Sequence, residues 1–263
     1  MALKHRSPFQ VFRSVIFALL VRELKTRFGR WRLGYVWAVL EPMMMIIILA
    51  LVMTYLRGRE PWFNIPVPVF IGIGFLLYNF WQSLAMRAAG AISSNDGLFG
   101  YRQVKPYDTV FARAILETII VVFVAAILVW LADWFFNLGV AIYDPLRAML
   151  VFILLVGFSY GLGLIIAVFG ALQPEFAKVI PMVSRPMLFI SGVMFPLAVV
   201  PENLQPYLLW NPLLHAIEQM RFSLYPQYPA EKTSLMFLAG SALVTLAAGH
   251  IVYQAKRHKL IAS

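Results

Sequence analysis

Charged side chains inside long apolar stretches are the first candidates for chemistry in this sequence. Asn79, Ser83 and Arg87 recur every four residues, so a helix would carry them on one face. Arg185 lies in another apolar stretch and directly precedes Pro186, which removes a backbone donor and kinks a helix. A charge at membrane depth costs about 2.5–3.5 kcal/mol on insertion scales, so each of these groups requires a partner or a function.

Two interpretations of these charges stay open, a fixed ion pair and a transport path. As structural groups, Arg87 pairs with Glu41 or extends toward the membrane surface, and Arg185 pairs with Glu41 or Glu117. As path groups, both guanidinium ions offer hydrogen-bond donors to a passing substrate. The candidate path residues are Trp37, Glu41, Tyr78, Trp81, Arg87 and Arg185.

Residues for covalent chemistry and nucleotide binding are missing from the sequence. A P-loop requires Gly followed by Lys, and none of the sixteen glycines is followed by Lys. The sequence has no Cys, no HExxH and no cluster of carboxylates, which excludes a disulfide framework and a thiolate metal site. We therefore expect a transport protein without catalytic residues, metal or cofactor, which takes its energy from a partner.

The composition predicts an integral membrane protein. Of the 263 residues, 61% are hydrophobic and 13% are charged, whereas a soluble domain is about half apolar and about a quarter charged. The formal net charge of +10 would suggest nucleic acid binding in a soluble chain. In a membrane protein it reflects Lys and Arg in cytoplasmic loops, so we expect no nucleic acid partner.

Six segments are long and apolar enough to span a bilayer, which takes about 20 residues of helix. They are 33–56, 66–90, 109–136, 146–172, 177–199 and 233–254. They make an all-α transmembrane domain over 33–254, preceded by residues 1–32 and followed by a tail at 255–263. Glu117 and Asp133 lie toward the ends of the third span and are expected to be structural. The fifth span is interrupted by Pro181, Pro186, Gly192 and Pro196.

Two shorter segments are expected at the membrane surfaces. Residues 1–32 predict an interfacial helix that starts with Ser7 as cap and Pro8 in its first turn. The 200–232 segment is too polar to span, and it predicts two short helices that dip into the outer leaflet, with Asn211 and Pro212 at the start of one. The candidate outer-gate residues of this segment are Trp210, His215, Glu218 and Arg221.

The loop between the second and third spans is the candidate for energy coupling. It combines charges with the aromatic residues Phe99 and Tyr101, which a simple connector would not need unless they rest on lipid. We favour docking to a partner, aided by the basic end of the N-terminal helix. The candidate coupling residues are Arg22, Lys25, Asp96, Phe99, Arg102 and Lys105.

At this point the sequence resembles a known family over nearly its whole length. The resemblance rests on RELKTRFGRWRLGYVWAVLEP at 22–42, NDGLFGYRQVKPYDTVFAR at 95–113, RPMLFISGVMFP at 185–196 and NPLLHAIEQMRF at 211–222. Together these motifs are similar to the membrane subunit of capsular polysaccharide exporters, which are type 2 ABC transporter permeases.

The resemblance implies a homodimer of six-helix subunits in the bacterial inner membrane. It implies two copies of a separate ATPase subunit, which hold ATP and Mg, and a lipid-linked, usually acidic, capsular polysaccharide as substrate. It also implies a periplasmic co-polymerase and an outer-membrane channel as partners. On this interpretation, Trp37, Tyr78 and Trp81 stack on sugar faces, while Arg87 and Arg185 donate to carboxylates or phosphates.

Three alternatives to this function stay open. The chain could be the permease of an O-antigen or teichoic-acid exporter, in which case a neutral polymer would not need a basic path. It could be a membrane-embedded lipid-modifying enzyme, which would form product without an ATPase. It could also be an assembly scaffold, which would not stimulate ATP hydrolysis.

The distribution of cations predicts that both termini are cytoplasmic. The side of the N-terminus carries fifteen Lys and Arg, of which eight lie in 1–32, three in 102–113, one at Lys178 and three in the tail. The opposite side carries five. We expect a reporter that is active only in the periplasm to be active after Tyr228 and silent after Lys259. Activity at both fusion points, or the reverse pattern, would contradict the six-span topology.

Overall fold

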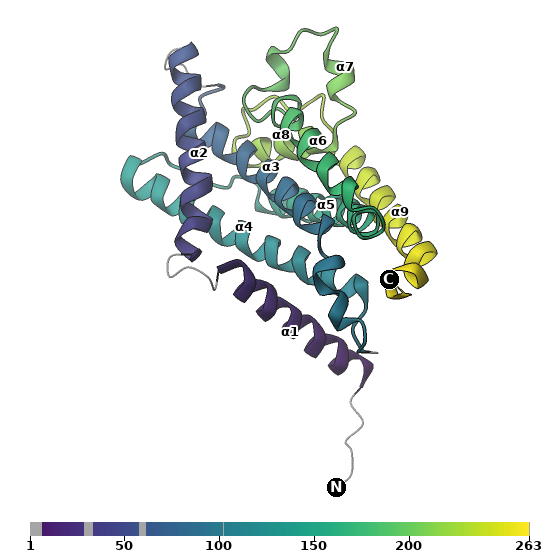
Figure 1. Ribbon diagram of the computed structural model, residues 1–263. Coiled ribbons are helices and arrows are strands. Elements are labelled where there is room, and N and C mark those ends of the chain that lie inside the picture. The colour runs from purple at the N-terminus through teal and green to yellow at the C-terminus, as the bar shows by residue number, and fades with distance from the viewer. Residues whose placement is uncertain (1–6, 29–33, 58–61, 102, 263) are drawn as a thin grey trace.

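The structure is a computed structural model that describes residues 7–28, 34–57, 62–101 and 103–262. These residues form α-helices and short 3-10 helices, and this part of the chain contains no β-strand (Figure 1). The elements are α1 (Pro8–Phe28), α2 (Gly34–Arg57), α3 (Val67–Ala89), η1 (Ser93–Leu98), α4 (Pro106–Phe136), α5 (Pro145–Leu172), η2 (Pro174–Lys178), α6 (Val179–Ile190), η3 (Leu197–Val199), α7 (Gln205–Leu208), α8 (Pro212–Leu224) and α9 (Leu235–Ala262). The predicted all-α fold class is confirmed.

Within the described residues, 5 helices are long and apolar enough to cross a membrane. These segments are Val36–Leu56, Val67–Ala89, Pro106–Phe136, Pro145–Leu172 and Leu235–Leu260. Each coincides closely with one predicted span, as expected for an integral membrane protein. The last helix runs past the predicted boundary at 254, so the predicted tail continues α9 as far as Ala262.

The predicted span 177–199 is not a single helix. Its longest helix, α6, has 12 residues and is about 18 Å long, well short of a hydrocarbon core of about 30 Å. The chain turns at Gly192, whose φ of 72° favours glycine, while Pro186 lies inside α6. The predicted interruption is confirmed, although α6 itself continues through Pro186. The total of six membrane spans stays a prediction.

The N-terminal helix forms where the sequence predicts it. The Gln10 amide donates to Ser7 Oγ at 3.3 Å and the Ser7 amide donates to Gln10 Oε1 at 3.1 Å, so the predicted cap is confirmed. α1 lies along α4 (Figure 1) and buries Ile16, Leu19 and Phe28. Its position at the membrane interface stays a prediction.

Two short helices, α7 and α8, precede the last long helix, as predicted. The side chain of Asn211 accepts a hydrogen bond from the Leu213 amide at 3.0 Å, which confirms Asn211 as the cap of α8. α8 packs against α3, α5 and α9, so its side chains are mostly buried. The depth of these helices in the outer leaflet stays a prediction.

α5 packs against both α3 and α9, and glycine sets the distance between α5 and α9. A Cβ atom on Gly161 of α5 would lie 2.5 Å from the Leu246 nitrogen of α9, so only glycine allows this approach. A Cβ atom on Gly157 would be 3.5 Å from Leu246 Cδ1, which is an ordinary contact. Of these two glycines, four residues apart on α5, Gly161 makes the tight contact.

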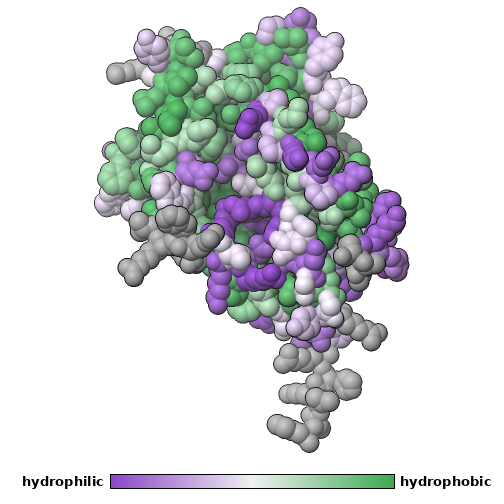
Figure 2. All heavy atoms as spheres, viewed as in Figure 1, coloured by the Kyte–Doolittle hydropathy of each residue, from purple (hydrophilic) through white to green (hydrophobic). Residues whose placement is uncertain are grey.

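The outer helices expose apolar side chains to the surroundings. Leu51 and Leu56 on α2, and Leu243, Val244 and Ile251 on α9, are all at least 64% exposed. The C-terminal end of α2 is accordingly a hydrophobic surface in Figure 2. In an integral membrane protein such surfaces face lipid or another subunit.

The glycine contact gives a test of the packing. Gly161→Ala should force α5 away from α9 and destabilise the protein by about 1–3 kcal/mol through overpacking. Gly157→Ala is the matched control and should stay close to the parent. Thermal unfolding of both purified variants in the same detergent measures the difference. Equal melting temperatures for the two variants would contradict the close approach at Gly161.

Candidate functional site

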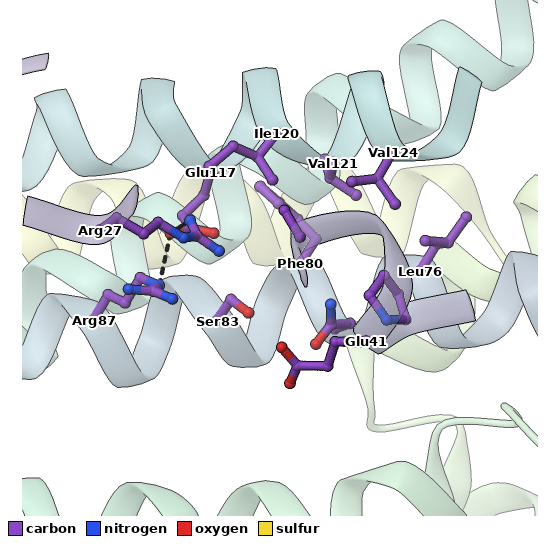
Figure 3. Close-up of a pocket in the computed structure, with 13 residues that line it drawn as sticks. Arg27, Glu41, Leu76, Phe80, Ser83, Arg87, Glu117, Ile120, Val121 and Val124 are labelled. Atoms are coloured by element: carbon purple, nitrogen blue, oxygen red, sulfur yellow. Dashed lines mark hydrogen bonds and ion pairs between the residues drawn. The ribbon is translucent and has the colours of Figure 1, made fainter. Parts of the chain in front are cut away.

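A polar pocket lies where the end of α1 meets α2, α3 and α4 (Figure 3). Its cavity volume is about 100 Å³, enough for several waters but not for a polymer of sugars. The polar residues that line it are Arg27, Glu41, Asn79, Ser83, Arg87 and Glu117. Four helices thus contribute polar groups to one small space in an otherwise apolar region.

One carboxylate organises this pocket. Glu117 of α4 is 5% exposed, and its Oε1 atom is 2.6 Å from Arg27 Nη1 and 2.8 Å from Arg87 Nε (Figure 3). Arg27 comes from the last turn of α1 and Arg87 from the last turn of α3. A buried carboxylate that accepts from two guanidinium groups therefore holds three helices together.

The predicted stripe on α3 is confirmed. Asn79, Ser83 and Arg87 all line the same pocket, with Glu41 of α2 on another side. The ion pair of Arg87, however, is with Glu117 and not with Glu41. Arg87 keeps 44% of its side chain exposed, so it is both a structural group and one that a ligand can reach.

The other predicted path residues lie outside this pocket. Tyr78 and Trp81 are buried, and the Tyr78 hydroxyl donates to the Ser184 carbonyl oxygen of α6 at 2.9 Å. Trp37 is exposed on α2. Arg185 is exposed on α6 and, among the residues that the structure describes, forms no ion pair with Glu41 or Glu117. The pocket therefore unites only Glu41 and Arg87 of the predicted path residues.

A second polar network ties α1 to the segment after α3. Arg113 of α4 pairs through Nε with Glu23 Oε1 at 2.9 Å and donates through Nη2 to Ser94 Oγ at 2.7 Å. Its Nη1 atom donates to the Arg87 carbonyl oxygen. Arg22 Nη2 donates to the Ser94 carbonyl oxygen at 3.4 Å. η1, α1 and α3 are thus connected through one arginine.

The structure brings the two predicted parts of the coupling region together in this network. Arg22 lies against η1, as shown by its bond to Ser94. Lys25, Asp96 and Lys105 are exposed, and Phe99 is half-buried. Arg102 lies outside the described residues. The side chains of Lys25, Asp96, Lys105 and Phe99 are accessible to a docking partner.

The predicted outer-gate residues differ in their surroundings. Trp210 is 80% exposed. His215 is buried, donates from Nε2 to the Leu209 carbonyl oxygen at 2.8 Å and accepts at Nδ1 from the Ser234 amide at 2.9 Å. Burial lowers the pKa of the His215 imidazole and so favours its neutral form. With both ring nitrogens bonded to backbone, His215 is a structural side chain in this conformation.

Arg221 and Glu218 form a buried cluster and do not line an open gate. Arg221 is fully buried, 3.1 Å from Glu218 Oε1, which also accepts from the Tyr228 hydroxyl at 2.5 Å. Burial raises the pKa of the Glu218 carboxyl, although the guanidinium opposes this shift. None of the residues of α8 is exposed. The helix therefore has no solvent face, and the spacing of its charged residues does not show that they are buried.

The two terminal nitrogens of Arg221 also bind backbone, whereas its buried Nε has no hydrogen-bond partner among the described residues. They reach the carbonyl oxygens of Gly192 at 2.7 Å, Val193 at 3.0 Å and Phe70 at 3.1 Å. The guanidinium carbon also lies 3.5 Å from the centre of the Phe70 ring. Arg221 therefore fastens the turn after α6 to α3.

Arg27 and Glu117 are the pocket residues that sequence reasoning did not select. Glu117 was assigned to structure and Arg27 to the basic end of the N-terminal helix. A signal was present, because a carboxylate inside an apolar span requires a cationic partner. The pairing could not be identified, since it depends on how α1 crosses α3 and α4.

Comparisons with known proteins agree with this architecture. Residues 14–225 match the ABC-2 type transporter family. The chain is 42% identical over 262 residues to the polysialic acid transport protein KpsM of Escherichia coli, covering 98% of this chain and 99% of that protein. It is 31% identical over 242 residues to the capsule polysaccharide export inner-membrane protein BexB of Haemophilus influenzae, covering 90% and 89%. With the inner-membrane protein CtrC of Neisseria meningitidis serogroup B it shares 31% over 231 residues, covering 82% and 83%.

The family match extends from α1 to the residue that follows α8. It therefore includes the Glu117 pocket, the coupling network and the Arg221 cluster. The long apolar helices are those of an integral membrane protein. The chain belongs to the ABC-2 type transporter family.

Proposed function

We propose that this chain is the permease subunit of an ATP-driven exporter of capsular polysaccharide. The observation that carries the proposal is the 42% identity, over nearly the full length of both chains, with a polysialic acid transport protein. Two further relatives bear names of capsule polysaccharide export, which favours this function over export of O-antigen or teichoic acid. The substrate is a lipid-linked acidic glycan that crosses the bacterial inner membrane.

Arg87 is the side chain of the Glu117 pocket that suits an acidic polymer best. Its guanidinium is partly exposed and keeps donors beyond the one that binds Glu117. A carboxylate or phosphate of the substrate would compete with Glu117 for those donors. Because the cavity is small in this conformation, the path opens only when α1 or α2 moves away from α3 and α4.

Energy comes from two copies of a separate ABC ATPase subunit, which hold ATP and Mg. The exposed side chains Lys25, Asp96 and Lys105 and the half-buried Phe99 form the docking surface, to which Arg102 is added from the sequence. A displacement of η1 acts on Ser94, and Arg113 transmits it to α1 through Glu23 and to α3 through the Arg87 carbonyl. ATP binding is thereby linked to the pocket.

The transporter is a homodimer with both termini in the cytoplasm. The exposed apolar faces of α2 and α9 support contacts with a second copy and with lipid. A periplasmic co-polymerase and an outer-membrane channel complete the export route. No catalytic residue or bound cofactor is required of this chain.

Reconstitution with the ATPase subunit tests this function. In proteoliposomes, short polysialic acid chains should stimulate ATP hydrolysis, whereas a neutral dextran of equal length should not. The reason is that the partly exposed guanidinium groups offer charge-assisted hydrogen bonds only to an acidic polymer. Equal stimulation by both glycans would contradict an acidic substrate, and product formation without the ATPase would favour a lipid-modifying enzyme.

A pair of variants separates the path from the scaffold. Arg185→Ala should lower surface capsule while leaving the amount of folded protein unchanged, and Arg185→Lys should keep part of the export because the charge remains. Glu117→Gln should instead reduce the amount of folded protein. It should lower the free energy of unfolding by about 1–3 kcal/mol, a range that allows for the partial exposure of Arg87. Capsule staining beside quantification of the membrane protein measures both effects. If Arg185→Ala also depletes folded protein, Arg185 is not a path residue.

A further inference from the structure

A second cavity lies where the loop between η1 and α4 meets the last turns of α9. Its volume is about 700 Å³, and its lining includes Tyr101, Lys105, Tyr107, His250, Tyr253 and Arg257. None of these residues takes part in the Glu117 pocket or in the Arg221 cluster. The cavity joins two segments that are far apart in sequence.

Among the described residues that line this cavity, Lys105 and Arg257 are the full cations, and they come from different elements. Lys105 lies at the start of α4 and Arg257 near the end of α9, and both are exposed. In residues 7–28, 34–57, 62–101 and 103–262, neither forms an ion pair. Asp108 is buried and accepts from the Lys105 amide at 2.9 Å, so its carboxylate caps the helix and does not line the cavity. The cavity is therefore positively charged.

Aromatic rings form the inner wall. The ring centre of Tyr107 is 5.5 Å from that of His250 and 5.8 Å from that of Tyr253. On α9 the lining residues His250, Tyr253 and Arg257 are spaced three and four residues apart, so they lie on one face of the helix. Where a helix leaves the membrane, aromatic residues are typically followed by a cationic residue toward the helix end.

We propose that this cavity binds the phosphate headgroup of an anionic phospholipid such as phosphatidylglycerol. Basic pockets between membrane helices bind such headgroups, and each cation near the surface contributes to the attraction. A lipid is favoured over free phosphate because the cavity adjoins the apolar exposed face of α9, where Ile251 is 68% exposed and can contact acyl chains. Binding does not depend on which glycan the transporter exports.

A bound headgroup would connect the coupling loop to the last helix. The phosphate would accept hydrogen bonds from Lys105 of the loop and from Arg257 of α9, both of which line the cavity. Arg257 has donors to spare, since it uses Nη1 for Gln254 Oε1 at 3.2 Å and Nε for His258 at 3.4 Å. The lipid would thus connect the loop that precedes α4 to the end of α9.

Native mass spectrometry of the transporter complex, with its ATPase subunit, tests the site. The complex is equilibrated in micelles that contain dioleoylphosphatidylglycerol, or dioleoylphosphatidylcholine, or inorganic phosphate without lipid. Lys105→Gln and Arg257→Gln should each reduce retained phosphatidylglycerol about fivefold, as expected for one charge near an anionic headgroup. Lys259→Gln is the matched control, because it removes an equal charge from the same helix outside the cavity lining.

Each other result overturns the proposal. Equal losses in Lys259→Gln would show diffuse surface attraction, and equal retention of phosphatidylcholine would show that charge plays no part. Displacement of the lipid by millimolar inorganic phosphate would identify a free-phosphate site. Because Lys105 also belongs to the proposed ATPase docking surface, lipid retention is the deciding measurement: unchanged retention in Lys105→Gln and Arg257→Gln would overturn the site whether or not the ATPase subunit stays bound. Lys105 and Arg257 are exposed on separate elements, so two independent variants guard against one that fails to fold.

Discussion

The pocket between α1, α2, α3 and α4 depends on a single carboxylate oxygen. Glu117 Oε1 accepts from Arg27 and from Arg87, so the end of α1 and the end of α3 are held by the same atom. A carboxylate in an apolar span is costly alone, and two cations in one small cavity repel each other. Each charge is therefore stable only while the other two stay in place.

This arrangement makes the inner pocket responsive. A competing anion that takes Arg87 from Glu117 leaves Arg27 as the partner of that carboxylate, and the hold of α1 on α3 weakens. The network around Arg113 connects the same helices to η1. Substrate and energy source would then act on one set of contacts from opposite sides, which is how two sites become coupled.

The length and hydropathy of the apolar runs were sufficient to predict the all-α class and, with five of the six predicted spans, the positions of the long apolar helices, since lipid demands long helices. The cap at Asn211 and the stripe of Asn79, Ser83 and Arg87 were also predictable from local patterns. The choice of Glu117 over Glu41 as partner of Arg87 was not, because pairing across helices depends on packing. The burial of Arg221 was hidden for the same reason: a helix pattern does not tell which neighbours cover it.

The cluster around Arg221 has a consequence for how this region tolerates substitution. Its three acceptors outside Glu218 are main-chain carbonyl oxygens of residues 70, 192 and 193, and every amino acid supplies such an oxygen. The backbone bonds by themselves therefore set no requirement on the side chains at these positions. Space is the stricter requirement, because a Cβ atom on Gly74 would lie 2.7 Å from Arg221 Nη2. In this part of the protein, the donor and the glycine that admits it are irreplaceable, and Phe70 is constrained by its ring beneath the guanidinium and not by the carbonyl oxygen that it supplies.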